Sequence, residues 1–338
     1  MWRRRPGRRA PAAGAGPVTD QRPELTTLVK RARDGDPRAV AKLITLVESN
    51  DPRLPELAAA LAADTGTAQV IGLTGAPGVG KSTVTAELVR ALRAAGRQRV
   101  GVLAVDPSSP FTGGAILGDR VRMQDHATDP GVYIRSMSSR GSLGGLAAAT
   151  PQAVRVLEGA GCEVILVETV GVGQAEVAVA SLADTTLVLL APGLGDAIQA
   201  AKAGILEIAD VFVVNKADRD GADATYHDIQ GMIGLADRAP GQWRPQVVRA
   251  VATRPSGIDE ILAAIDKHRD WLRTHDQLRR RREQRAAAEI EAIVLAGLRH
   301  RIEAVAALPG LAAAVAAGEQ DPYTAAGAIL TELGAARP

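Results

Sequence analysis

The sequence has a single cysteine, Cys162, so no disulfide can form within the chain and nothing indicates an oxidising compartment. Aromatic residues make up only 2% of the sequence, so its core must be built mainly from Ala, Val, Leu and Ile. No uninterrupted apolar run approaches the ~18 residues that a membrane span requires. We therefore expect a cytoplasmic chain with no membrane-spanning segment and no disulfide framework.

An excess of one charge is also missing. The formal net charge is +2, and five arginines within residues 3–9 account for more than that excess. Without a basic field over the rest of the chain, we expect no nucleic-acid partner and no attraction to an anionic membrane. Residues 1–19 are basic, rich in Ala, Pro and Gly, and lack the apolar centre of a secretory signal. We interpret them as a disordered tail rather than a targeting segment.

Two patterns divide the remaining chain before its C-terminal part. Residues 20–66 carry apolar residues at helical spacing, with breaks at residues 35–37 and 50–52, which predicts a small N-terminal helical subdomain. From residue 67 to 268 the pattern changes to short, β-branched apolar runs, typical of strands buried on both faces. These runs are residues 70–73, 100–105, 164–167, 187–190, 211–214 and 246–250.

Helical stretches lie between several of these runs, at residues 83–95, 151–158 and 195–207. Strands that alternate with helices predict an α/β fold with a mostly parallel, doubly wound sheet. The expected sheet domain therefore spans residues 67–268.

Residues 269–338 are expected to form a C-terminal helical arm. A charged helical pattern runs from residue 258 to about residue 305 and contains the basic run 279–282. An apolar stripe follows at helical spacing: Ile290, Ile293, Val294, Leu298, Ile302 and Val305. Such a stripe outside the sheet domain needs a partner surface, which is either another part of this chain or a second copy of it.

A phosphate-binding loop is the strongest motif. It matches G-x-x-x-x-G-K-[ST] in full, after the first predicted strand and before a predicted helix. The predicted nucleotide-binding residues are Gly75, Ala76, Pro77, Gly78, Val79, Gly80, Lys81, Ser82 and Thr83. Glycines let backbone N–H groups turn toward phosphates, and the helix N-terminus adds partial positive charge. Lys81 is expected at the β- and γ-phosphates, and the Ser82 hydroxyl at Mg²⁺.

The motif N-K-x-D follows the buried run at residues 211–214 and predicts a guanine pocket. The Asp218 carboxylate can accept hydrogen bonds from both N1–H and N2–H2 of guanine, whereas adenine offers no such donor pair. Asn215 and Lys216 would brace the pocket, and the Ala252 backbone N–H would meet guanine O6. We therefore expect GTP and GDP, rather than ATP, as the bound nucleotides.

Two acids follow strands on the metal side. Glu168 ends the run at residues 164–167, where P-loop proteins place an acid that holds Mg²⁺ through a water, and most GTPases have Asp there. Asp106 ends the run at residues 100–105, at the same predicted edge of the sheet. Gly171 is then positioned to give its backbone N–H to the γ-phosphate. Ser82, Asp106 and Glu168 are the predicted metal-side residues.

The sequence resembles the MeaB/ArgK family of P-loop GTPases. The resemblance rests on the phosphate loop together with residues 105–114 (VDPSSPFTGG), 116–120 (ILGDR), 139–145 (SRGSLGG) and 168–174 (ETVGVGQ). It extends from about residue 31 to residue 256.

This resemblance implies a GTP-hydrolysing chaperone of an adenosylcobalamin-dependent acyl-CoA mutase, typically methylmalonyl-CoA mutase. Such a protein gates cofactor loading and protects or reactivates the mutase. It also implies a homodimer with a helical C-terminal arm. The family also has a third mobile loop, after the fourth strand, and residues 192–202 match it. By the resemblance, Gln199 and Lys202 of this loop would move toward the nucleotide when the partner binds. The family commonly reads Asp-Glu-Leu-Gln-Gly in this loop, while residues 196–200 here read Asp-Ala-Ile-Gln-Ala.

Other functions fit less well or stay open. Nickel-inserting GTPases carry Cys- or His-rich clusters, which one cysteine and five histidines cannot build, and four methionines exclude the Met-rich partner domain of signal-recognition GTPases. A P-loop kinase that passes the γ-phosphate to a transport protein or small molecule stays open. So does a switch whose nucleotide state only controls binding to the mutase. The sequence has no Asp-x-His-x-x-Gly motif, so we do not expect this chain to hold cobalamin in that manner.

Overall fold

The computed structural model describes residues 24–106, 126, 128–138, 149–169, 175–193, 206–237, 239, 241–254 and 256–334. The expected basic tail, residues 1–19, lies outside them. No helix in these described ranges is both long and apolar enough to cross a membrane.

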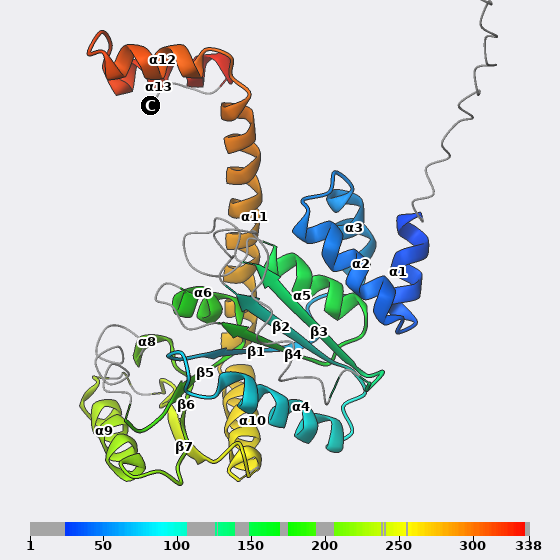
Figure 1. Ribbon diagram of the computed structural model, residues 1–338, viewed down its shortest axis with the longest axis vertical. Coiled ribbons are helices and arrows are strands. Elements are labelled where there is room, and N and C mark those ends of the chain that lie inside the picture. The colour runs from blue at the N-terminus through cyan, green and yellow to red at the C-terminus, as the bar shows by residue number, and fades with distance from the viewer. Residues whose placement is uncertain are drawn as a thin grey trace, which may run out of the picture.

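Seven strands form one sheet, in the order β3-β2-β4-β1-β5-β6-β7, and every neighbouring pair is parallel (Figure 1). The strands are β1 (Gln69–Thr74), β2 (Val100–Asp106), β3 (Val132–Ser138), β4 (Val164–Thr169), β5 (Thr185–Leu190), β6 (Val211–Asn215) and β7 (Gln246–Ala250). The predicted α/β fold is confirmed. The edge strand β3 was not predicted, because Arg135 and two serines interrupt its apolar pattern.

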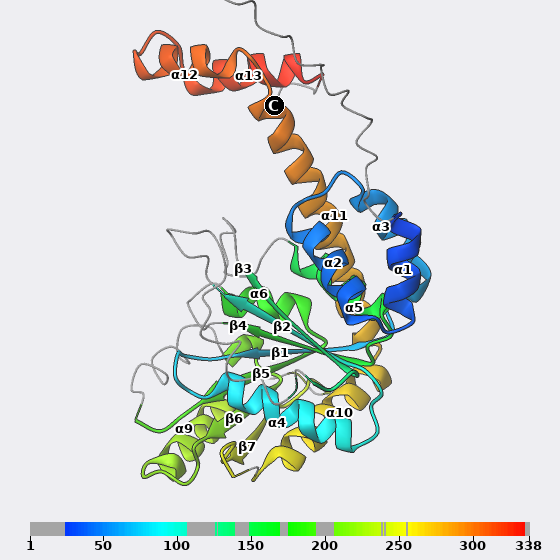
Figure 2. The ribbon, with the colours of Figure 1, turned by 45° about the vertical axis from the view of Figure 1, so that its right-hand side comes forward.

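Helices cover both faces of the sheet, as a doubly wound fold requires (Figure 2). On one face lie α4 (Lys81–Ala94) and α10 (Ile258–Thr274), and on the other lie α5 (Thr150–Gly159), α6 (Ala175–Leu182) and α9 (Ala222–Leu235), with α8 (Leu206–Ile208) before β6. Alternate side chains of each strand serve the two faces. In β2, for example, Val102 belongs to the α4 side and Leu103 to the α5 side.

The predicted N-terminal helices are present as α1 (Leu25–Arg33), α2 (Pro37–Glu48) and α3 (Leu54–Leu61), followed by the short η1 (Ala62–Asp64). The Asp36 side chain caps α2 by accepting hydrogen bonds from the N–H groups of Arg38 and Ala39. Buried side chains of all three α-helices join one apolar cluster with α5 and the sheet. The N-terminal helices therefore share the core of the sheet domain.

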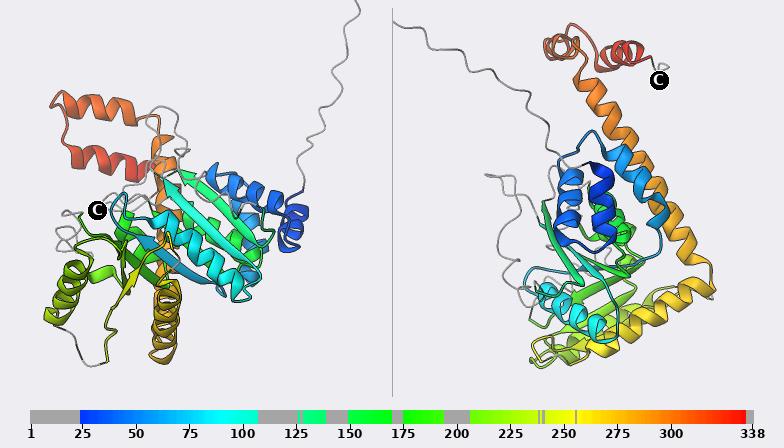
Figure 3. Two further views of the ribbon diagram at one scale, coloured as in Figure 1. Left: turned by 60° about the horizontal axis from the view of Figure 1, so that its bottom comes forward. Right: turned by 90° about the vertical axis from the view of Figure 1, so that its right-hand side faces the viewer.

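The helical pattern predicted to run from residue 258 to about residue 305 is two helices. The first, α10, ends at Thr274, and α11 (Gln277–Glu303) begins after Asp276, whose left-handed φ of 55° lies at the turn between the two helices. Helix α11 extends away from the sheet to the pair α12 (Leu308–Ala316) and α13 (Pro322–Glu332) (Figure 3). None of its residues is buried.

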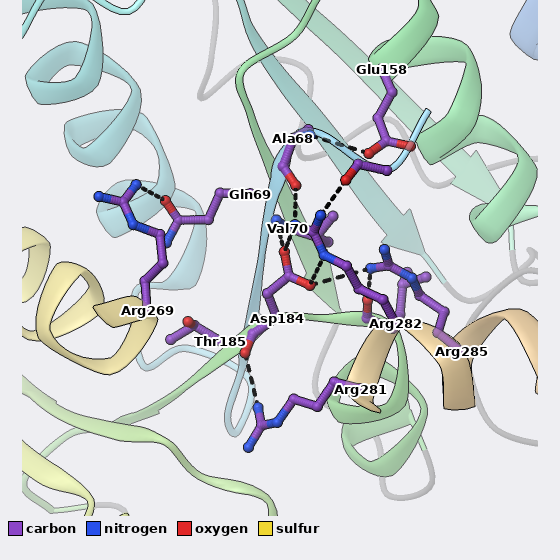
Figure 4. Close-up of polar contacts among 12 residues, drawn as sticks. Ala68, Gln69, Val70, Glu158, Asp184, Thr185, Arg269, Arg281, Arg282 and Arg285 are labelled. Carbon is purple, nitrogen blue, oxygen red and sulfur yellow. Dashed lines mark hydrogen bonds and ion pairs between the residues drawn. The ribbon is translucent and has the colours of Figure 1, made fainter. Parts of the chain in front are cut away.

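Arginines near the start of α11 attach this arm to the amino ends of two strands (Figure 4). The Asp184 carboxylate, which is 2% exposed, accepts a hydrogen bond from the Val70 N–H at 3.0 Å and one from Arg282 Nη2 at 2.9 Å. Arg285 Nη1 lies 3.7 Å from the same carboxylate and donates to the Leu182 carbonyl at 2.7 Å. These contacts tie the arm to the starts of β1 and β5.

Asp210, just before β6, is the second anchor. It accepts hydrogen bonds from Arg281 Nη1 at 2.9 Å and Nη2 at 2.8 Å. His268 lies 3.2 Å from the same carboxylate, but burial lowers its pKa to about 4, so the imidazole is neutral at neutral pH. Arg281 therefore supplies the charge that balances Asp210. We call Asp184, Asp210, Arg281, Arg282 and Arg285 the arginine clamp.

The clamp predicts unequal effects of two Asp→Asn substitutions. Asp184→Asn removes a buried charge that faces two arginines, and we expect it to lower the free energy of unfolding by about 2–3 kcal/mol. Asp276→Asn is the control, because the Asp276–Arg279 pair is exposed and exposed pairs contribute little. Chemical denaturation measures both. Equal unfolding free energies for the two variants would contradict a stabilising role for the clamp.

Candidate functional site

The carboxyl ends of the parallel strands bring the predicted site residues to one edge of the sheet. In the strand register, Glu168 of β4 lies opposite Leu73 of β1 and Ala104 of β2. Asn215 of β6 lies opposite Ala250 of β7. The phosphate loop follows β1, which is central, so the metal side and the base side lie on either side of it. This edge is where open α/β sheets bind ligands.

Three glycines give the phosphate loop its path, with φ angles of 141° at Gly75, 81° at Gly78 and 98° at Gly80. Space is also restricted. A Cβ on Gly75 would lie 2.3 Å from the Leu189 carbonyl oxygen, and one on Gly80 would lie 2.4 Å from Asn215 Nδ2. Only glycine satisfies both conditions at these two positions. The loop then enters α4, whose N-cap, Gly80, has no side chain to occupy the first helical N–H groups.

The Lys81 side chain folds back over this loop. Its ammonium donates to the carbonyl oxygens of Gly75 at 2.7 Å and Ala76 at 3.1 Å, and the residue is 7% exposed. A buried ammonium beside a helix N-terminus concentrates positive charge at the loop. That charge suits the phosphates of a nucleotide.

The metal side contains a buried acid between two hydroxyls. Ser82 Oγ donates to Glu168 Oε1 at 2.6 Å, and Thr85 Oγ1 lies 2.9 Å from Glu168 Oε2. Glu168 is 5% exposed and Thr85 is fully buried. A hydroxyl and a carboxylate are the hard oxygen donors that Mg²⁺ prefers, so these residues fit that ion. Asp106 is the last residue of β2, one residue beyond the Val105–Thr169 pair of β2 and β4, so its backbone lies at the same edge of the sheet. Its side chain lies outside the described part of the chain.

The base side is organised by Asn215. Its Nδ2 donates to the Val79 carbonyl at 2.8 Å, and its Oδ1 accepts from the Ala252 N–H at 3.2 Å. One amide thus joins the phosphate loop to the loop after β7. Lys216 has a left-handed φ of 56°, and its ammonium donates to the Gly78 carbonyl at 2.6 Å. Asn215 and Lys216 therefore both contact the phosphate loop.

Of the two groups predicted to contact guanine, the Asp218 carboxylate is exposed and the Ala252 N–H already has a partner. Asp218 is exposed in the turn after β6, so its carboxylate is available to a ligand. The Ala252 N–H, predicted to meet guanine O6, is already donated to Asn215. The next amide, that of Thr253, has no hydrogen-bond partner among the described residues.

Three predicted residues, Gly171, Gln199 and Lys202, lie outside the described residues. Thr85 was not among the predicted site residues. Its position three residues after Ser82 on a helix was an available signal, because such residues lie on the same helix face. Within the described ranges no three His, Cys, Asp or Glu side chains gather as a metal-binding group.

Comparisons with known proteins agree with this geometry. A family model described as methylmalonyl Co-A mutase-associated GTPase MeaB matches residues 40–307. A protein of Pyrococcus abyssi with a GTPase name is 48% identical, over 91% of this chain and 97% of its own length. GTPase ArgK of Escherichia coli is 38% identical, over 78% of this chain and 81% of its own. The methylmalonic aciduria type A homolog of Caenorhabditis elegans is 34% identical, over 79% and 71%.

Among solved structures, one described as an LAO/AO transport system kinase superposes with a TM-score of 0.68 at 28% identity, over 92% of this chain and 97% of its own. The family model covers well over half of the chain, and the relatives match it along most of their own length. The chain therefore belongs to the MeaB family of methylmalonyl-CoA mutase-associated GTPases, and it is a GTPase.

Proposed function

We propose that this GTPase hydrolyses Mg²⁺–GTP to gate adenosylcobalamin loading and to protect or reactivate an acyl-CoA mutase, most directly methylmalonyl-CoA mutase. The observation that carries the nucleotide part is the Asn215 amide, which joins the phosphate loop to the base side at hydrogen-bond distance. The family model's description and the name of the Caenorhabditis elegans relative support the mutase part.

The roles of the residues follow from their charges and positions. The N–H groups of the glycine loop and the Lys81 ammonium neutralise the β- and γ-phosphates. Ser82, Glu168 and Asp106 hold Mg²⁺, which when bound shields the charge on the phosphate oxygens. The Gly171 backbone N–H donates to the γ-phosphate, and by the family resemblance Gln199 and Lys202 move toward the nucleotide when the partner binds. Hydrolysis is then slow until the mutase supplies that arrangement.

On the base side, Asp218 accepts both hydrogen bonds from the guanine edge. We assign the contact with guanine O6 to the Thr253 N–H, because the Ala252 N–H is donated to Asn215. Holding the Ala252 amide in this way fixes the loop that presents the Thr253 amide. Asn215 therefore aligns both ends of the nucleotide.

Asp218→Asn tests the base side. We expect it to weaken GTP binding by at least about a hundredfold, because two hydrogen bonds to a carboxylate are lost, and to improve binding of xanthosine triphosphate. Calorimetry on the purified chain measures both affinities. Asp220→Asn is a matched control, since Asp220 is exposed in the same turn. Unchanged GTP affinity in Asp218→Asn would refute the assignment of the guanine pocket.

The alternative is a P-loop kinase that transfers the γ-phosphate to a transport protein or small molecule. This alternative is favoured by the solved structure with a TM-score of 0.68, which is described as a transport system kinase. The two functions differ in where the γ-phosphate goes. They can therefore be separated in one labelling experiment.

GTP labelled at the γ-phosphate should yield free phosphate with this chain, slowly when it is alone and several times faster with purified methylmalonyl-CoA mutase. The reason is that binding of the mutase would bring Gln199 and Lys202 of this chain toward the γ-phosphate. Bovine serum albumin at equal concentration controls for nonspecific effects. Label that appears on a protein or metabolite would favour the kinase, and a rate that ignores the mutase would contradict the proposed partner.

The α11 arm provides the surface for the proposed homodimer. Ile290, Ile293 and Val294 are 63%, 54% and 53% exposed, and Leu298 is 39% exposed. These four residues form one stripe on a helix of which no residue is buried. An apolar stripe of this kind is typical of a protein–protein interface. We propose a second copy of the chain as its partner, as the family resemblance implies.

Val294→Asp tests this dimer. A carboxylate at the centre of the stripe would lose hydration on association, so we expect a monomer in sedimentation velocity where the wild-type chain is a dimer. Ala292→Asp is the control, because Ala292 lies on nearly the opposite face of α11 and is also exposed. If both variants stay dimeric, the stripe is not the interface. If the wild-type chain is monomeric, the homodimer itself is wrong.

A further inference from the structure

Thr85 is a buried hydroxyl that the roles given above do not use. It lies on α4 three residues after Ser82, so both side chains project from the same helix face toward β4. Its residue exposure is 0%. A hydroxyl in such a place needs a hydrogen-bond partner, because burying it without one costs free energy.

Two acceptors lie within reach of the single Thr85 proton. The Lys81 carbonyl oxygen is 3.0 Å away and Glu168 Oε2 is 2.9 Å away. A carboxylate is the stronger acceptor because it carries charge. The helix carbonyl of Lys81 is, by contrast, the ordinary local partner of a threonine on a helix. The Thr85 hydroxyl therefore donates its hydrogen bond to the Glu168 carboxylate.

The two hydroxyls divide the Glu168 carboxylate between them. Ser82 Oγ donates to Oε1 at 2.6 Å, and Thr85 Oγ1 donates to Oε2. Each oxygen thus has its own donor, and the plane of the carboxylate is set by two contacts from one helix. With Oε2 held in this way, Oε1 is the oxygen directed toward Ser82.

This arrangement matters because the acid is a glutamate. A glutamate has one more rotatable side-chain bond than the aspartate that most GTPases have at this position, so it loses more conformational freedom when it is fixed. A second hydrogen bond offsets that loss before any ligand arrives. Preorganisation of this kind favours binding of an ion without contacting it.

We infer that Thr85 is a positioning residue for the metal side: its hydroxyl holds Oε2 of Glu168 so that Oε1 faces Ser82, the residue that would ligate Mg²⁺. The inference rests on the Mg²⁺–GTP site of the proposed function. Thr85 itself touches neither the nucleotide nor the ion. Its loss should therefore weaken only the part of nucleotide binding that depends on Mg²⁺.

The test compares GDP affinity in saturating Mg²⁺ with GDP affinity in EDTA, by calorimetry on the full chain. Thr85→Val keeps the branched shape and removes the hydroxyl, while Thr85→Ser keeps the hydroxyl. Thr225→Val is the matched control, because Thr225 is also buried and donates to a helix carbonyl four residues back, that of Gly221, at 3.0 Å. Thermal melting checks that each variant is folded.

We expect the ratio of the two affinities to fall about tenfold in Thr85→Val, the loss typical of one hydrogen bond to a charged group. Thr85→Ser and Thr225→Val should keep the wild-type ratio. If Thr85→Val does not fold, Thr85→Ala removes the same hydroxyl without adding a methyl group and carries the same expectation.

Two results would overturn the inference. One is a wild-type ratio in Thr85→Val. The other is an equal fall of affinity in Mg²⁺ and in EDTA, which would mean that the hydroxyl supports α4 rather than the acid. A wild-type chain that binds GDP equally well in both buffers would instead refute the magnesium part of the proposed function.

Discussion

The nucleotide site depends on one side chain, the Asn215 amide. Its two polar atoms contact two loops that are far apart in the sequence, donating to the Val79 carbonyl and accepting from the Ala252 N–H. The phosphate loop and the base side are therefore held at a fixed separation before a nucleotide binds. The same contact explains Gly80, where a Cβ would lie 2.4 Å from Asn215 Nδ2. Preorganisation lowers the ordering cost of binding, and here it comes from a residue whose main role is structural.

Much of the fold could be predicted from the sequence because buried parallel strands read as short apolar runs. Six of the seven strands follow from such runs, and the phosphate loop and N-K-x-D motif locate two corners of the site. The edge strand β3 could not be found in this way, since Arg135 in its centre makes an ion pair with Glu48 of α2. The boundary between α10 and α11 could not be predicted from the helical pattern either. Asp276 adopts a left-handed φ that a helical periodicity does not reveal.

Contacts between distant residues were the least predictable part of the site. The motif placed Asn215 near the base, but its bond to Val79 joins residues 136 positions apart. In the same way, the sequence showed the basic run at residues 279–282 but not the groups that it contacts. Arg281 and Arg282 contact buried carboxylates at the amino ends of β6 and β5, while Arg279 pairs with exposed acids. Sequence spacing defines which residues share a helix face, but not what that face meets.

Charged side chains have different roles at the two edges of the sheet. At the amino edge, Asp184 and Asp210 are satisfied by arginines of the same chain, so the charges are balanced and α11 is held in place. Arg155 of α5 adds a further contact to Glu289 of α11. At the carboxyl edge, Lys81 donates to backbone carbonyls and Glu168 accepts from hydroxyls, so hydrogen bonds orient both charged side chains. Charged groups that are oriented before a ligand arrives need little reorganisation when phosphate and metal ion bind, which is the condition that a nucleotide site requires.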